Sequence, residues 1–353
     1  MVARFLRRIN LATQVLISGK ISAGKRDAIP AITKEEVTEA KLFFPMEKFF
    51  IFGHARSGTT LLARLVRKHP EVHCNYQAHF FTRPPLLQDL VTDQGVGKWL
   101  TRSSNRWNRG RDLSPVVMRA VSDFILERDA RQVGKNVVGD KSPNSLLNGE
   151  AVRLLFNIYP DANLVFIVRD GRDAVLSHRF QSFIDNPQHL TKEDEHIYET
   201  FIKNPQPFLN GERSLFTEKG ITHSAEGWVH NVDETDYWGR ELFGERFFSM
   251  RFEDLLKHPW NEMVRLWSFL GVKTDITSLD DTVKDELTRN PDADWQQYKA
   301  GEIAQVVQKG KHGSWRELFT QRDIQIFEEI AGETQLNWGY ESSILQEGDQ
   351  QRE

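Results

Sequence analysis

The sequence has too few cysteines for an internal disulfide and no apolar run long enough to cross a membrane. Its 353 residues include one cysteine, Cys74, so no disulfide can form within the chain. No stretch approaches the ~20 consecutive apolar residues of a membrane-spanning helix. Because intracellular proteins keep their thiols reduced, we expect a cytoplasmic protein.

The sequence also lacks an excess of charge of one sign. Lys and Arg total 46 against 50 Asp and Glu, which gives a net charge of −4. Proteins that coat nucleic acid need a cationic excess to displace counterions, so we expect no nucleic-acid partner. No cluster of His and Cys has metal-ligand spacing, and we expect no metal. A local basic pocket for one phosphorylated ligand is compatible with this balance.

The first segment, residues 1–45, is predicted to be a partly helical lead-in, an N-terminal segment that precedes the domain. It begins MVARFLRRINLATQVLISG, an Arg-rich start with a short apolar run that Asn10, Thr13 and Gln14 interrupt. Without a clear cleavage site, a signal peptide is less favoured than an amphipathic helix. Such a helix either packs on the protein or makes weak contact with a membrane surface. We expect one domain over 46–340 with helical insertions near 83–130 and 178–235, then a polar tail over 341–353.

Short apolar runs that end in polar residues indicate buried parallel strands. The run KFFIF at 48–52 ends at Gly53 and precedes helical spacing over 59–68. Further strands are predicted at 137–140 and 163–170, and a helix is predicted at 150–158. The segment 247–256 is predicted to be a strand that runs into one continuous helix. The pattern predicts an α/β fold, a three-layer αβα sandwich with a mostly parallel central sheet. In such sheets ligands bind at the carboxyl ends of the strands.

The segment GHARSGTT, residues 53–60, has the spacing of a phosphate-binding loop. Gly53 and Gly58 let backbone N–H groups converge on an anion at a helix N-terminus. Thr59 and Thr60 add hydroxyl donors. Nucleotide hydrolases need Lys directly after the second glycine, whereas here the cation comes earlier, at Arg56. This favours a ligand with one 5′ phosphate over a triphosphate; the alternative is a tight turn that binds nothing.

Three separated motifs resemble the PAPS-dependent sulfotransferase superfamily, where PAPS is 3′-phosphoadenosine 5′-phosphosulfate. Residues 50–74, with R-S-G-T-T, resemble its 5′-phosphosulfate loop, and LVFIVRDGRDAVLSH (164–178) resembles its 3′-phosphate motif. QKGKHGSWRELFT (308–320) is similar to its closing motif, although Gln308 stands where the family usually has Arg. The resemblance implies PAPS as sulfuryl donor, PAP as product, and these donor-binding residues: Gly53, Arg56, Ser57, Gly58, Thr59, Thr60, Arg169, Ser177, Lys309 and Gly310.

The chemistry of Arg169 suits that role. At the end of an apolar strand, its guanidinium can fork onto phosphate oxygens. Ser177 lies about two helical turns further on, so it reaches the same group only if the chain after Asp170 folds back as a helix. The alternative is a surface ion pair between Arg169 and Asp170 or Asp173.

Sulfuryl transfer is an in-line displacement in which the leaving phosphate oxygen gains charge. Lys141, in GDKSPN at a predicted strand end, resembles the family's second catalytic cation. Our hypothesis is that Arg56 and Lys141 both stabilise the bridging oxygen. The alternative for Lys141 is an ordinary solvated lysine.

The general base is less clear. HPEVHCNYQAHFF (69–81) resembles the family stretch that supplies a catalytic Glu, but Gln77 stands at that position and an amide cannot accept a proton. In an extended segment His79 would project to the same face as Gln77, and a neutral imidazole is a competent base. We therefore assign His79 as base and Gln77 as an acceptor-orienting group. The alternative is a structural His79 packed between Phe80 and Phe81.

Two other functions stay open. A P-loop kinase or nucleotide hydrolase would need the missing loop lysine and a magnesium ligand, for which Asp140 and Asp170 are weak candidates. A non-catalytic PAP-binding relative is the second alternative, because Gln77 and Gln308 depart from the family.

The acceptor is expected to be a hydroxyl of a small molecule, a carbohydrate or a peptide. Missing anchors and disulfides favour a cytoplasmic enzyme over the Golgi type that sulfates protein tyrosine. Five aromatic residues could wall an acceptor pocket, although for each one the core is the favoured location: Trp99, Trp107, Trp228, Tyr237 and Trp238.

Overall fold

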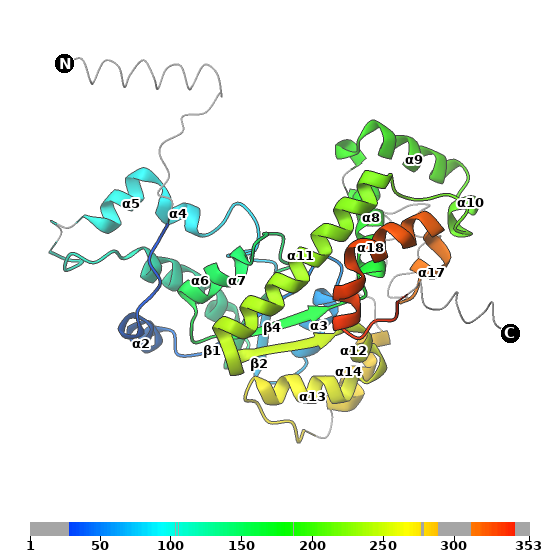
Figure 1. Cartoon of the computed structure of the whole chain (residues 1–353). Helices are drawn as coiled ribbons and strands as arrows, with labels where there is room; N and C mark the ends of the chain where they lie inside the picture. Colours follow the sequence, from blue (N-terminus) through cyan, green and yellow to red (C-terminus); the bar gives the residue numbers. More distant parts are fainter. Residues whose placement is uncertain are drawn as a thin grey trace, which may run out of the picture.

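A five-stranded parallel sheet forms the centre of the molecule (Figure 1). The computed structural model describes residues 28–102, 104, 106–185, 187–276, 279–288 and 312–342. The strand order is β2-β3-β1-β4-β5, and all four pairings are parallel. The predicted α/β fold is confirmed. The strands are β1 (Glu47–Phe52), β2 (Val72–Tyr76), β3 (Val137–Lys141), β4 (Asn163–Val168) and β5 (Phe247–Arg251).

Helices cover both faces of the sheet (Figure 1). One face is packed by α6 (Ser114–Gln132), α7 (Glu150–Ile158), α11 (Glu218–Phe243) and α18 (Gln321–Asn337). The other is packed by α3 (Thr59–Val66), α12 (Phe252–Lys257), α13 (Pro259–Phe269) and α14 (Leu279–Thr288). The remaining labelled helices are α2 (Lys34–Phe43), α4 (Gln88–Thr92), α5 (Gln94–Thr101), α8 (Gly171–Asp185), α9 (Lys192–Lys203), α10 (Gln206–Leu209) and α17 (Trp315–Leu318).

The apolar run of β1 supplies both cores. Phe50 and Phe52 join the cluster beneath α6 and α7, whereas Phe49 and Ile51 join the cluster beneath α3 and α13. Successive side chains of a strand point to opposite faces, so only a continuous apolar run can bury a strand on both sides. This is why the strands could be recognised from the sequence.

The predicted elements are present except after β5, but β2 was not predicted from the sequence. The helix predicted at 150–158 is α7, and the helix predicted at 59–68 ends at Val66. The single helix predicted after β5 is wrong, because α12 ends at Lys257 and α13 begins at Pro259. Proline lacks the N–H of a continuing helix and disfavours the α conformation in the residue before it, here His258 at φ −132°.

The two predicted insertions contribute to the common core. Leu100, Phe201 and Phe208 are buried in the same apolar cluster as the residues of β1 and β4. The division into one domain with two insertions stays a prediction that these contacts support. Of the predicted lead-in, α2 is described and residues 1–27 lie outside the described part; most of the predicted tail does too.

A buried ion network joins β1 to α6. Lys48 Nζ lies 2.6 Å from Glu127 Oε1 and 3.5 Å from Asp123 Oδ1, and all three side chains are almost fully buried. The same ammonium donates to the carbonyl oxygens of Phe44 and Met46. Removing one partner from such a network leaves an uncompensated buried charge.

We predict that Lys48→Met destabilises the fold by about 3–5 kcal/mol, because two carbonyl oxygens lose their donor and the buried carboxylates of Asp123 and Glu127 keep only Arg119 and Arg131 as cationic partners. Urea denaturation measures the change in the free energy of unfolding. Arg128→Ala, which breaks an exposed pair with Asp129, is the control and should leave the denaturation midpoint unchanged. An unaltered midpoint for Lys48→Met would show that the network contributes nothing.

Candidate functional site

The predicted site residues gather where β1, β3 and β4 end. These three strands are neighbours in the parallel sheet, so their carboxyl ends share one edge. The loop 53–58 follows β1, Lys141 ends β3, and Arg169 directly follows β4.

Packing requires both glycines of the loop. Gly58 precedes α3 with φ +87°, and a Cβ there would lie 2.2 Å from the Phe252 ring. A Cβ on Gly53 would lie 2.7 Å from the carbonyl oxygen of Ile167. The loop is thereby drawn tightly against β4 and α12. The first N–H groups of α3, at Thr59 and Thr60, point out of the helix without intrahelical acceptors.

Ser57 adds an unused donor to this loop. Its side chain is fully buried, and its hydroxyl has no hydrogen-bond partner within the described residues. Burying an unsatisfied hydroxyl costs free energy. Together with the helix N-terminus, it makes the loop a cradle for an anion.

Arg56 joins the loop to the helix after β4. Its Nε donates to Ser177 Oγ over 3.1 Å, and Arg169 Nη1 donates to the Arg56 carbonyl oxygen over 3.1 Å. Because α8 begins at Gly171, the chain after Asp170 does fold back as a helix, which brings Ser177 to the loop. The two predicted anion-binding segments are therefore one continuous site.

Two guanidinium groups lie close together at this site. Burial, and then the charge of Arg169, lower the pKa of Arg56 from its ordinary value, and Asp185 opposes that shift. Like charges held near each other favour binding of an anion between them. Asp170 accepts three hydrogen bonds from Arg172, so the ion pair considered from the sequence is not formed with Asp170. The charge of Arg169 does act on Asp173, where it opposes the rise in pKa that burial causes.

Lys141 is a buried cation beside the loop. Its side chain is 1% exposed, its Nζ donates to Thr60 Oγ1 over 3.2 Å, and the Tyr76 ring lies 5.5 Å away. The structure thus excludes the ordinary solvated lysine considered from the sequence. A lysine held here places a second cation next to the anion cradle.

The segment that carries Gln77 and His79 is a turn. Both residues have positive φ, +56° and +51°, so the expectation of an extended segment with both side chains on one face is wrong. His79 Nδ1 lies 2.8 Å from Thr82 Oγ1. Burial, then the charges of Arg83 and Lys141, lower the pKa of His79 to about 4, so the imidazole is neutral at pH 7.

Asp140 holds this turn, a role that the sequence did not suggest. Its buried carboxylate accepts the Ala78 N–H over 3.1 Å and the Ser142 hydroxyl, and Ser142 Oγ accepts the His79 N–H over 2.9 Å. The Gln77 N–H donates to the Lys141 carbonyl oxygen over 2.7 Å. The strand end that supplies Lys141 therefore also sets the left-handed turn beside it.

Two histidines at the site were also missed. His54 follows Gly53 in the loop and His178 follows Ser177 on α8, with ring centroids 6.3 Å apart. Burial, then the charge of His178, lower the pKa of His54 to about 4; burial, then Arg56, lower the pKa of His178. Both histidines lie within motifs that were interpreted through their glycine, arginine and serine residues. Nothing in the sequence indicated that the two histidines lie close together.

Asp173 attaches the end of the predicted closing motif to α8. Its carboxylate accepts the backbone N–H groups of Gly313 and Trp315. This brings the described end of that motif to the helix that carries Ser177. Lys309 and Gly310 lie outside the described residues, so their contact with a 3′ phosphate stays a prediction.

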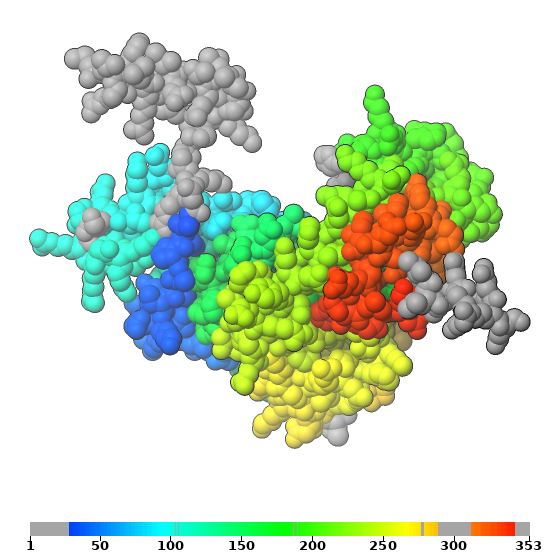
Figure 2. Space-filling model, viewed as in Figure 1, coloured from blue at the N-terminus to red at the C-terminus, as the bar shows by residue number. Residues whose placement is uncertain are grey.

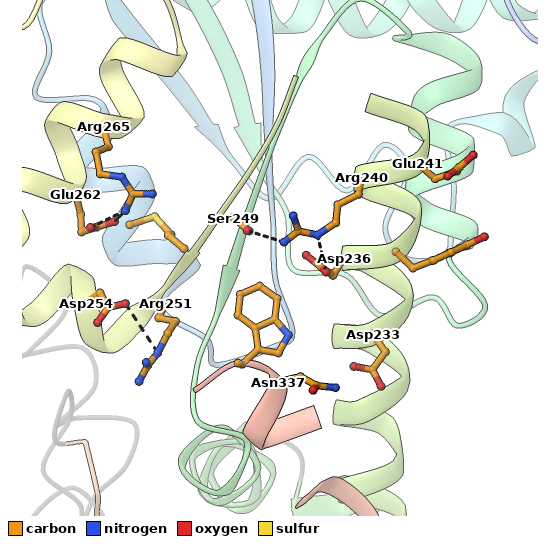
Figure 3. Close-up of a pocket in the computed structure, with 13 residues that line it drawn as sticks. Asp233, Asp236, Arg240, Glu241, Ser249, Arg251, Asp254, Glu262, Arg265 and Asn337 are labelled. Carbon is orange, nitrogen blue, oxygen red and sulfur yellow. Dashed lines mark hydrogen bonds and ion pairs between the residues drawn. The ribbon is translucent and has the colours of Figure 1, made fainter. Parts of the chain in front are cut away.

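A pocket of about 700 Å³ lies elsewhere, between α11, α13, α18 and the edge strand β5 (Figure 3). It contains none of the predicted site residues. Its three arginines face five carboxylates, and Arg240 and Arg265 each lie 2.8 Å from a carboxylate. Without surplus positive charge it does not suit a phosphorylated ligand.

The five aromatic residues differ in environment. Trp228 is fully buried and Trp238 packs against the core, as favoured from the sequence. The core location is wrong for Tyr237, Trp99 and Trp107, which are 60%, 56% and 53% exposed. Tyr237 lines the pocket of Figure 3 rather than the anion cradle.

Comparison with protein families identifies the family to which this chain belongs. Residues 48–275, well over half of the chain, match the model of the sulfotransferase family. Protein-tyrosine sulfotransferase of Drosophila melanogaster is 25% identical over 231 residues, which cover 64% of this chain and 38% of the relative. Protein-tyrosine sulfotransferase A of Caenorhabditis elegans is 26% identical over 234 residues, covering 64% and 50%. The chain thus spans about half or less of the length of these relatives.

Other relatives are more diverse. Mouse heparan sulfate glucosamine 3-O-sulfotransferase 6 is 24% identical over 233 residues, 64% of this chain and 53% of the relative. Among solved structures, mouse sulfotransferase SULT7A1 complexed with PAP matches 86% of this chain and 90% of its own, at 16% identity and a TM-score of 0.45.

The expected cytoplasmic location is wrong. The Drosophila and Caenorhabditis relatives are protein-tyrosine sulfotransferases, which are enzymes of the Golgi lumen. A single cysteine excludes a disulfide within the chain, but it does not exclude an oxidising compartment. No helix in the described ranges has the length and apolar character needed to span a bilayer.

Asp140 gives a prediction about pH. Burial raises the pKa of Asp140 to about 6, with Ser142, Ala78 and Lys141 opposing the shift. A carboxyl whose pKa is higher in the folded state favours folding while protonated, and this contribution is lost as pH rises through about 6. The side chain introduced by Asp140→Asn stays neutral at every pH. The free energy of unfolding of this variant, relative to that of the wild type, should therefore increase by up to about 3 kcal/mol between about pH 4 and about pH 7.

Urea denaturation of both proteins at several pH values measures this difference. Because every other titrating group is shared, its contribution cancels in the comparison. A difference that is constant with pH would contradict the raised pKa.

Proposed function

The chain belongs to the sulfotransferase family, and we propose that it moves a sulfuryl group from PAPS to a hydroxyl of an acceptor. The single observation that supports this best is the contact of Arg56 with both Ser177 and Arg169. It makes one site from the loop after β1 and the helix after β4. A ligand with phosphate groups at both ends of one adenosine matches that arrangement.

The residues present fit such a donor. The Ser57 hydroxyl is buried without a partner in the described chain, and the loop would lose its shape if either glycine carried a Cβ. In this proposal the loop and the N-terminus of α3 hold the 5′-phosphosulfate. Arg169 and Ser177 hold the 3′ phosphate, and Lys309 and Gly310 complete that contact.

Lys141 and Arg56 stabilise charge in the transfer step. The donor supplies the sulfuryl group: its bond to the phosphate oxygen breaks as a bond to the acceptor oxygen forms. In this proposal Lys141 Nζ, which donates to Thr60 beside the loop, neutralises the charge that develops on the leaving oxygen. Both cations are preorganised by contacts already present, so little reorganisation is needed during the reaction.

His79 takes the proton of the acceptor hydroxyl in this proposal, and Gln77 orients the acceptor. The imidazole is neutral at pH 7, as a proton acceptor must be. Its pKa is low partly because of Arg83 and Lys141. An anion bound beside Lys141 would offset that positive charge and make His79 a stronger base.

The acceptor is proposed to be a hydroxyl of a peptide, a carbohydrate or a small molecule. The relatives are named for protein tyrosine and for a glucosamine of heparan sulfate. Transfer of labelled sulfate from PAPS to a tyrosine peptide, a glucosamine oligosaccharide or a simple phenol tests the proposal.

Two further measurements separate it from the alternatives. Tight binding of PAP but not ATP, with turnover that EDTA leaves intact, distinguishes it from a metal-dependent kinase or hydrolase. PAP binding without transfer to any acceptor would favour the non-catalytic relative. The expectation that no metal is needed stays a prediction until then.

We predict that Arg169→Ala weakens PAP binding about 10- to 100-fold, because a charge-assisted hydrogen bond to phosphate is lost. Lys141→Met should instead lower kcat with a small effect on PAP binding, since its cation acts on the transition state. Calorimetry gives the affinity and labelled transfer gives kcat. Arg240→Ala, in the pocket of Figure 3, is the matched control and should change neither. If all three substitutions had equal effects, the donor site would not lie where we propose it.

We predict that His79→Ala lowers kcat by about 10²- to 10⁴-fold while PAP affinity persists, because only the base is removed. Gln77→Glu in the His79→Ala background restores a carboxylate at the family's base position and should recover part of the rate. Single-turnover transfer measures the chemical step. Full turnover by His79→Ala would exclude His79 as the base.

A further inference from the structure

Two tryptophans form an exposed pair at the end of α5. Trp99 is 56% exposed and Trp107 is 53% exposed, with ring centroids 5.0 Å apart and an interplanar angle of 31°. Each ring could bury about 150–250 Å² if it were covered. The pair therefore presents exposed aromatic surface to a partner.

The segment that carries this pair is rich in positive charge. Between Gln94 and Arg111 the sequence has five cations and no Asp or Glu, in a chain whose net charge is −4. All five cationic side chains are exposed, and Arg111 lies 3.7 Å from Glu36. We call Trp99, Trp107 and these cations the Trp–Arg patch; the cations are Lys98, Arg102, Arg106, Arg109 and Arg111.

Local hydrogen bonds hold the patch in shape. The buried Asn108 donates through Nδ2 to the carbonyl oxygens of Leu100 and Arg102, over 3.3 and 3.4 Å, and accepts the Gly110 N–H. Asp93 caps the start of α5 by accepting two backbone N–H groups. The exposure of the tryptophans is thus part of a packed turn, and the Asp93 carboxylate at its start is engaged in a helix cap.

The patch lies on a projecting lobe. Figures 1 and 2 show α4 and α5, in cyan, extending from the left side of the molecule, away from α8 and α18. The pocket of Figure 3 is lined by other residues. Small ligands and sugars are usually bound in concave sites, whereas a convex lobe suits a broad, flat partner.

We propose that the Trp–Arg patch docks this protein onto an anionic lipid membrane. Indole rings prefer the boundary between lipid headgroups and acyl chains, where their apolar faces are covered and their N–H groups stay hydrated. Lys and Arg near an anionic leaflet each add favourable electrostatic energy. The patch places both kinds of side chain on one protruding surface, so the enzyme would sit at the membrane with that lobe inserted.

Co-sedimentation of the full chain with vesicles tests this. The wild type should bind phosphatidylcholine vesicles that contain about 30% phosphatidylserine, and should not bind pure phosphatidylcholine. Arg102→Gln/Arg106→Gln/Arg109→Gln should weaken the partition about 100-fold, and Trp99→Ala/Trp107→Ala at least about 10-fold. Unchanged melting temperature and PAP affinity confirm that these variants fold.

Two matched controls locate the contact. Leu42→Ala/Phe43→Ala removes exposed apolar side chains on α2 and should leave vesicle binding intact. Arg7→Gln/Arg8→Gln tests the N-terminal segment, the other region considered for membrane contact, and should also leave it intact. Binding that survives both patch variants, or that is lost only with Arg7→Gln/Arg8→Gln, would overturn the proposal. Capture of heparin or an acidic peptide, in place of vesicles, would overturn it too.

Discussion

The candidate site depends on the close approach of two guanidinium groups. Arg56 and Arg169 come from the ends of neighbouring strands, and the Arg169 side chain reaches the backbone of Arg56. Folding places like charges together in a partly buried site, which costs free energy that a bound anion recovers. In the proposed function the glycines, the helix N-terminus and the buried Ser57 hydroxyl hold the same anion. Without a bound anion, the free-energy cost of this arrangement would not be offset.

The end of β3 contributes a further cation and the turn beside it. Lys141 faces the loop, while the residues on either side of it, Asp140 and Ser142, hold the turn with Gln77 and His79. One strand end therefore sets both the cation and the proposed base. This coupling explains why a carboxylate is kept buried at a position where burial raises its pKa. Its hydrogen bonds to the turn compensate in part for the loss of water.

The predicted resemblance to sulfotransferases is confirmed by the family match, whereas the predicted cytoplasmic location is wrong. The resemblance used residues that bind or position a ligand, and these are local in sequence. Location was inferred from what the chain lacks, and one cysteine constrains disulfides alone. The Trp–Arg patch offers a physical link to membranes that needs no spanning helix, because it relies on interfacial burial and charge.

The sequence by itself determined four of the five parallel strands, the phosphate loop and the position of Ser177 two helical turns after Arg169. Those features depend on neighbours in the chain: apolar runs, glycine spacing and two turns of a helix. Only the tertiary structure decided the rest. The turn at Gln77 and His79 is set by Asp140 and Ser142, more than sixty residues away along the chain, which no local period encodes. The exposure of Trp99 and Trp107 likewise depends on how Asn108 closes a turn against α5, because the same tryptophans would suit a core equally well.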